Sequence, residues 1–328
     1  MLNAKRYFVH HLRSVLPRLA VFSVFAVLIT GITAVESHSN YAPEHSNSAF
    51  YILSLIIGFL ATLIPIVEFS GYNNERNVDT LFSLPISRSS LAAVHITVGF
   101  IQMFSVFTVS TVALFISHLS FREFYDLYYI IPYYFSVLGL GTIVYFIFTF
   151  IFTRANTTFD GLVFCVFWMF NLYTVYMLAD RIFRFKHSYD LLVIYAPIDN
   201  VTTYFQYLAE KTDRNMYFSR LEGTFISLWC VLGILALVGT VLTFGKKKVE
   251  KIGEISDSVF GYVLNIPLYF ICFVGFFDDV TATMWLAICA VIGYFIYRRG
   301  FKLKKKDIIS IAIAFLILVI LNVLKGQM

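Results

Sequence analysis

The sequence predicts an all-α membrane protein that crosses the bilayer several times. Hydrophobic residues make up 59% of its 328 residues and charged residues only 14%, with a mean hydropathy of +0.77. Soluble domains average roughly 45–50% apolar and about 25% charged residues. The apolar runs are long and unbroken, as spanning helices of about 20 residues require, and they lack the alternation of barrel strands. Both observations predict helices.

The candidate spans follow the apolar runs in order along the chain. We expect spans at roughly 18–35, 49–68, 91–117, 130–153, 160–179, 223–244, 259–277, 280–297 and 308–324. An amino terminus inside the cell places most of the 25 Lys and Arg residues on the cytoplasmic side, as the positive-inside rule expects. This orientation makes the loop 73–90 cytoplasmic and the segment 180–222 external.

The basic segment before the first span is amphipathic. In residues 3–17 one helical face carries Phe8, Leu12, Val15 and Leu16, and the charged residues lie largely elsewhere. This pattern predicts an interfacial helix that lies on the membrane and leads into the first span. A solvated basic tail is the alternative.

The external segment 180–222 is long for a connection, and its middle is apolar. Pro197 interrupts the apolar stretch. Long loops with an internal pattern usually have a function or a fold of their own. We expect a small external cap or a re-entrant pair here.

The spans contain few ionisable groups, and these lie near span ends. Glu68 and Asp160 occupy such positions, and no Asp, Glu, Lys or Arg lies near a span centre. Proton relays and coupling-ion sites need ionisable groups within the membrane, so the pattern disfavours proton antiporters and intramembrane proteases. His95 lies about one turn inside the third span, where we expect a hydrogen-bonded packing histidine.

No motif for metal, disulfide or nucleotide binding is recognisable. The stretch GTVLTFGKKK at 239–248 has the wrong glycine spacing for a phosphate-binding loop and lacks Ser or Thr after the lysine. We therefore expect no catalytic residue, no metal ligand and no cofactor bound by this chain. The cysteines show no CxxC or Cys/His spacing and fit small buried residues: Cys165, Cys230, Cys272 and Cys289.

A short polar segment, NNERNVDTLFSLPISRSS at 73–90, separates the second and third spans. Val78, Leu81 and Phe82 share one helical face by their spacing. We expect a short amphipathic helix over about 74–84 across the cytoplasmic ends of these spans. Docking to a cytosolic partner and mere closure of a loop are both open from the pattern alone.

Both ends of this short helix carry sequence signals. Asn74 can cap its start, and Glu75 places a favourable charge in the first turn. Pro85 ends the helix by Leu84, because the residue before a proline avoids the α conformation. The third span can then be capped by a serine: Ser87, Ser89 or Ser90.

Two motifs resemble those of a known family. VDTLFSLPISRSSL at 78–91 resembles the first cytoplasmic loop of type-2 ABC exporter permeases, in which an acidic, leucine-rich stretch leads into S-L-P-[IV]-S-R. KKKVEKIGEISDSVF at 246–260 resembles the K/R-x-x-E-x-x-G pattern after the sixth span of antimicrobial-peptide and drug exporters common in Gram-positive bacteria. The resemblance covers about 1–260.

The resemblance implies a six-span permease core over 1–245, with the interfacial helix, a coupling helix at about 74–84 and the external insertion at 180–222. Residues 246–328 then form a cytoplasmic connector and an extension of about three further spans, which departs from the family pattern. By analogy, the residues that contact the ATPase are Glu75, Asp79, Leu81, Phe82, Pro85 and Arg88.

The resemblance also implies the function. The chain would be the membrane subunit of an ATP-driven exporter in the bacterial plasma membrane, moving an amphipathic or hydrophobic compound such as a peptide, drug or lipid-like molecule. Its partners would be a second permease, cytosolic ATPase subunits that hold ATP and magnesium, and membrane lipid, with no role for nucleic acid.

Two other classes of function remain open at this stage. A sensor or scaffold without transport activity could recruit a cytosolic partner through the same loop and bind a ligand outside. A lipid-modifying enzyme is the least favoured class, because its candidate groups are scattered at Asp278–Asp279 and His10–His11.

Overall fold

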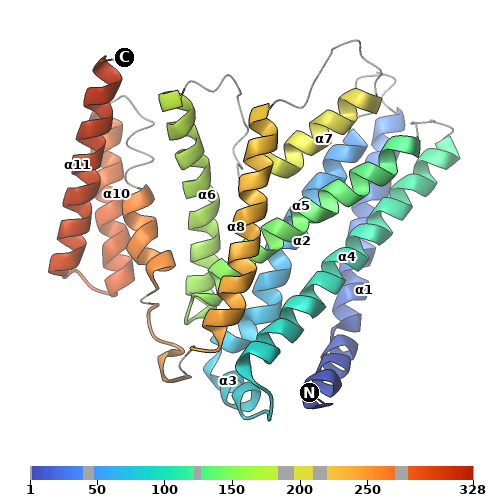
Figure 1. Ribbon diagram of the computed structural model, residues 1–328, viewed down its shortest axis with the longest axis horizontal. Coiled ribbons are helices and arrows are strands. Elements are labelled where there is room, and N and C mark those ends of the chain that lie inside the picture. Colours follow the sequence, from blue (N-terminus) through green and yellow to red (C-terminus); the bar gives the residue numbers. More distant parts are fainter. Residues whose placement is uncertain are drawn as a thin grey trace. The chain divides into compact units, whose positions relative to one another are not determined.

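The computed structural model describes residues 2–39, 48–121, 127–183, 196–209, 220–247, 249–256, 258–269 and 280–327. Helices and short connections make up all of these residues, and no strand occurs among them (Figure 1). The predicted all-α class is therefore confirmed.

The helix bounds follow the predicted apolar runs. The helices are α1 (Leu2–Ser39), α2 (Ser48–Phe69), α3 (Glu75–Phe82), α4 (Arg88–Phe121), α5 (Leu127–Thr153), α6 (Thr158–Phe183), α7 (Ala196–Ala209), α8 (Arg220–Phe244), α10 (Val280–Arg298) and α11 (Lys305–Gln327). A further short apolar helix, kinked at Gly261, covers Val259–Tyr269.

Within the described part of the chain, five helical segments are long and apolar enough to cross a membrane: Ala4–Thr33, Phe50–Asn73, Arg88–Ser117, Tyr129–Thr153 and Ile226–Phe244. The predicted spans at 160–179, 280–297 and 308–324 fall within α6, α10 and α11. Of the predicted span 259–277, residues 270–277 lie outside the described part of the chain. The full number of spans stays a prediction.

Large apolar side chains point outward from several of these helices. Phe59 on α2, Phe135 on α5 and Leu242 on α8 are 64%, 64% and 65% exposed. Water would penalise such surfaces, whereas lipid tails accept them without cost. Outward apolar faces on long helices support a membrane-embedded protein.

The helices group into two compact units that do not follow chain order. The first contains residues 1–71, 79–150 and 195–247, and the second contains 72–78, 151–194 and 248–328. We predicted a boundary at residue 245 between the permease core and the C-terminal extension. The grouping of helices into compact units does not test this boundary, which stays a prediction.

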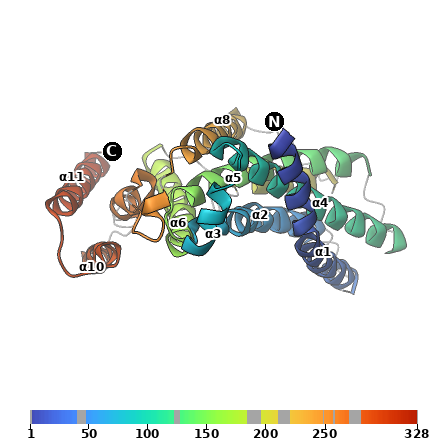
Figure 2. The same ribbon diagram turned by 90° about the horizontal axis from the view of Figure 1, so that it is seen from below.

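In the first unit α1, α2 and α4 pack on one another (Figures 1 and 2). Close approach between α2 and α5 needs a glycine, because a Cβ at Gly141 would overlap the side chain of Ile57. Tyr133 of α5 adds a cross-link here, since its hydroxyl donates to the carbonyl oxygen of Phe50 at 2.6 Å.

The segment predicted as an interfacial helix is the first part of the longer helix α1. Residues 3–17 are helical but continue without a break through Pro17 into the rest of α1. Val15 is buried with Val94 and Val98 of α4, and the partly buried Phe8 packs against them, as do Tyr7 and Leu12. The apolar face was recognised correctly, and α4 covers most of it; the position of this segment at a membrane surface stays a prediction.

The predicted external segment is partly described. It contains α7, in which Pro197 lies in the first turn, where a missing backbone N–H costs nothing. Pro197 therefore starts a helix and does not interrupt one. The ring of Phe205 meets Tyr133 edge-on at 5.7 Å, and α7 packs on α2. Residues 184–195 and 210–219 lie outside the described residues.

In the second unit α6 packs on the short helix Val259–Tyr269. Asn171 of α6 donates through Nδ2 to Oδ1 of Asn265 at 2.8 Å, and both residues are fully buried. At Gly261 the backbone is kinked, and a Cβ there would overlap the ring of Phe164. The kink interrupts the helix at Gly261, and the asparagine pair ties the segment to α6.

Candidate functional site

The short helix between α2 and α4 forms as predicted. α3 covers Glu75–Phe82, and the chain then turns through Pro85. Ser87 is the serine that caps α4, because its Oγ accepts the backbone N–H of Ser90 at 3.2 Å. Val78 is buried, with 2% of its surface exposed, as its place on the apolar face predicts.

The residues predicted to contact an ATPase separate into two groups. Asp79 and Pro85 are exposed. Leu81, Phe82 and Arg88 are half-buried and contact their own chain. The side chain of Glu75 lies outside the described part. The structure thus leaves the first group free for a partner and uses the second group internally.

The internal group ties the end of α3 to its neighbours. The Phe82 ring lies edge-on to Phe244 at the end of α8, with ring centroids 6.4 Å apart. Arg88 lies over the Phe82 ring, with its guanidinium carbon 4.6 Å from the centroid, and its Nη1 donates to the carbonyl oxygen of Lys247 at 2.5 Å. Phe69 of α2 also meets Phe244, at 5.9 Å. We call Phe69, Phe82, Arg88 and Phe244 the α3 joint.

A second candidate site is a buried polar cluster around Glu68, near the end of α2. The Glu68 side chain is fully buried. Its Oε1 accepts hydrogen bonds from Gln102 Nε2 at 2.7 Å and from Arg18 Nη2. Its Oε2 accepts from His11 Nε2 at 2.8 Å and from His95 Nδ1 at 3.0 Å. All the acceptor positions of the carboxylate are therefore used.

Tyr7 completes this Glu68 cluster. Its hydroxyl lies 3.0 Å from His95 Nε2. When Nδ1–H of His95 donates to Glu68, Nε2 is left as an acceptor for the Tyr7 hydroxyl, so one neutral tautomer satisfies both contacts. The Tyr7 ring also stacks on His11, with centroids 5.8 Å apart and planes 4° apart.

The Glu68 cluster joins α1, α2 and α4, and Arg18 supplies a positive charge opposite the buried carboxylate. A buried carboxylate is stable only when its acceptor positions are satisfied, and both oxygens of Glu68 are. His11, Glu68 and His95 also bring three possible metal-ligand atoms within 4.8 Å of one another.

Sequence reasoning found part of this cluster. The position of Glu68 near the end of its span and the hydrogen-bonded packing role of His95 are both confirmed. The roles of His11, Arg18 and Gln102 were missed. A glutamate in the apolar run of α2 was the available signal, because a buried carboxylate needs donors from somewhere.

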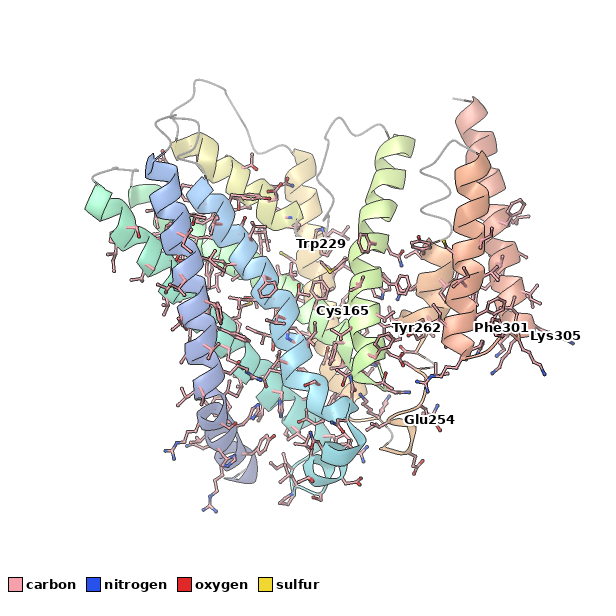
Figure 3. The ribbon with its side chains drawn as sticks, turned by 180° about the vertical axis from the view of Figure 1, so that it is seen from behind. Cys165, Trp229, Glu254, Tyr262, Phe301 and Lys305 are labelled. Carbon is pink, nitrogen blue, oxygen red and sulfur yellow. The ribbon has the colours of Figure 1, made fainter. Side chains whose placement is uncertain are left out.

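The second unit holds a basic cavity of about 810 Å³ at the turn between α10 and α11. Figure 3 shows Phe301 and Lys305 at this turn and Glu254 on the connector. Cationic side chains dominate the lining, which includes Arg298, Arg299, Lys302, Lys304 and Glu254. Arg298 is already paired with Asp307, at 2.5 Å and 2.9 Å.

The connector before α10 is anchored at its glycine. Gly253, the last residue of the K-x-x-E-x-x-G pattern, has a φ of 90° and donates its N–H to the carbonyl oxygen of Asn156 at 3.2 Å. Ser256 N–H donates to Oδ2 of the buried Asp160 at 3.3 Å, and the hydroxyl of Tyr262 donates to its Oδ1 at 2.8 Å. The glycine of the K-x-x-E-x-x-G pattern therefore has a structural role, because it anchors the connector in a backbone conformation that favours glycine.

Comparisons of the chain with protein-family models, curated proteins and solved structures give no match.

Proposed function

We propose that this chain is the transmembrane subunit of an ATP-driven exporter of the bacterial plasma membrane, powered by a separate ATPase chain. The observation that carries the proposal is α3: an eight-residue amphipathic helix between two long apolar helices, with an exposed tip and a base fixed to its neighbours. The amino terminus lies at the same end of the first unit as the turn after α3, which the proposal makes cytoplasmic (Figure 1).

The α3 joint suits mechanical coupling. A partner that binds the exposed Asp79 and Pro85 would displace α3 as a unit. Through Phe82 and Arg88 the displacement would reach the end of α8, and through Phe244 it would reach α2. Rigid elements in contact transmit such movements, whereas a loose loop would absorb them.

The energy source and the partners follow from the same proposal. The chain lacks a phosphate-binding loop, so ATP and magnesium would belong to the ATPase subunits. A second permease, identical or a sister chain, would complete the pathway, and membrane lipid would surround it. The cargo would be an amphipathic or hydrophobic compound, taken from the cytoplasm or the inner leaflet.

The test is affinity purification from native membranes in mild detergent, with mass spectrometry of the co-purifying proteins. Since Leu81 and Phe82 contact their own chain, the informative substitution is at the exposed surface: Asp79→Arg. A matched control is Lys5→Glu, which reverses another exposed charge on α1. We expect an ATPase with the wild type and the control, and its loss with Asp79→Arg.

Different outcomes overturn different steps. An ATPase retained by Asp79→Arg would reject α3 as the contact and leave the exporter proposal standing. No ATPase with any of the three proteins, in complexes shown to be intact, would reject the exporter.

The alternative, a sensor or scaffold without transport activity, rests on the segment that contains α7. Reconstituted vesicles separate the two functions. ATP hydrolysis that responds to a candidate cargo, without movement of that cargo, would favour the sensor.

A further inference from the structure

We propose that His11, Glu68 and His95 form a binding site for a divalent transition metal, zinc in the first place, where α1, α2 and α4 meet. The inference rests on the geometry of the Glu68 cluster and is independent of the proposed export function.

The three donor atoms are those that zinc takes in proteins. Two imidazole nitrogens and one carboxylate oxygen form one of the sets of protein ligands found at zinc sites with an open fourth position. His11 Nε2 and His95 Nδ1 lie 2.8 Å and 3.0 Å from Glu68 Oε2. Zinc bonds of about 2.0–2.1 Å place tetrahedral ligand atoms roughly 3.3 Å apart. Each nitrogen–oxygen pair needs to open by only about 0.3–0.5 Å.

The donor types also set the choice of ion. Calcium and magnesium prefer sites made almost wholly of oxygen ligands. Two imidazoles with one carboxylate suit zinc and its first-row neighbours. The tilted rings of His11 and His95, with centroids 4.1 Å apart, bring both nitrogens to the same carboxylate oxygen.

The surrounding side chains orient the donors as outer partners do in known metal sites. Gln102 holds Oε1 of Glu68, which leaves Oε2 facing the two nitrogens. With the ion on Nδ1 of His95, its proton moves to Nε2 and donates to the Tyr7 hydroxyl at the same 3.0 Å contact. Such partners fix the tautomer and the ring orientation of a ligand.

Burial determines how an ion would reach the site, and the charge of Arg18 affects how tightly it would bind. The side chains of Glu68 and His95 are 0% and 5% exposed, and that of His11 is 18% exposed, so an ion would enter past His11. Arg18 is the one charge in the cluster that opposes binding, because it already neutralises Glu68. Removing it should therefore strengthen binding.

The experiment uses the full chain in detergent, purified through a tag without histidine. The protein is stripped with a chelator, exposed to zinc chloride and desalted, and its zinc is measured by elemental mass spectrometry. His10 provides the matched control, since it neighbours His11 but is exposed. We expect one zinc per chain for the wild type and for His10→Ala, and at least tenfold weaker retention for His11→Ala and His95→Ala.

Arg18→Gln keeps the test decisive if the histidine variants fail to fold. If the cluster is a metal site, this variant should bind zinc more tightly than the wild type does. If the cluster only forms hydrogen bonds, the variant should bind no zinc. The proposal is overturned if neither the wild type nor Arg18→Gln retains zinc, or if a folded His11→Ala protein retains as much as the wild type.

Discussion

Glu68→Gln is the most informative single change in the first unit. The carboxylate accepts four hydrogen bonds and donates none, two at each oxygen. An amide keeps one acceptor oxygen but replaces the other with an NH2 group. With the NH2 group in place of Oε1, the donors of Arg18 and Gln102 face a third donor; with it in place of Oε2, both imidazoles must change tautomer to accept it.

The structure sets the expected magnitude. Two hydrogen bonds to a charged group are lost, each contributing about 1.5–3 kcal/mol. The positive charge of Arg18 also loses its partner, and breaking a buried ion pair costs about 3–5 kcal/mol. These estimates describe overlapping interactions and are not added. We expect the free energy of unfolding to fall by about 3–5 kcal/mol.

The assay is denaturant-induced unfolding in detergent micelles, with a chelator present so that no metal contributes. Asp79→Asn is the control, because the same change at an exposed carboxylate should stay within about 0.5 kcal/mol of the wild type. A Glu68→Gln protein that also stays within this margin would refute the reasoning, since the cluster would then contribute little to the stability of the fold.

Three further predictions concern other parts of the chain. Gly141→Ala should be about 1–3 kcal/mol less stable than Gly139→Ala in thermal unfolding, because a Cβ at position 141 overlaps Ile57 and a Cβ at position 139 overlaps nothing. Equal stability of the two variants would contradict the close approach of α2 and α5. Gly253→Ala should cost about 1–2 kcal/mol in the same assay, since a side chain is strained at a φ of 90°, and an unchanged melting temperature would argue against that conformation. Burial would raise the pKa of Asp307, but hydrogen bonds from Arg298 and from the backbone of Lys304 hold it below its ordinary value. The wild type should therefore be more stable than Asp307→Asn above about pH 4, and this difference in stability should vanish as the pH falls through the lowered pKa. Unfolding curves recorded between neutral and acidic pH measure the difference. A difference that stays constant with pH would refute the ion pair.

Local rules account for the helices. Each described apolar run is helical because a backbone in lipid must satisfy its own hydrogen bonds. The turn after α3 and the cap of α4 follow from Pro85 and Ser87, whose effects act within a few residues. These features depend on near neighbours in the chain, so the sequence alone predicts them.

Amphipathic faces show where local rules end. The pattern in residues 3–17 identifies an apolar face but not what covers it, and in the structure α4 covers most of it. The same holds for Leu81 and Phe82, which were predicted to meet a partner and which contact their own chain in the structure. Periodicity shows which residues share a face, and only packing shows what lies opposite.

The sequence by itself establishes a membrane-embedded, all-α chain with a short polar helix between its second and third long helices. It does not establish the Glu68 cluster, because the donors to Glu68 lie 27, 34, 50 and 57 residues away along the chain. Hydrogen bonds between side chains reach only about 3 Å, so they exist only after distant helices have packed. Tertiary packing therefore turns a lone acid near a span end into a buried, fully bonded site.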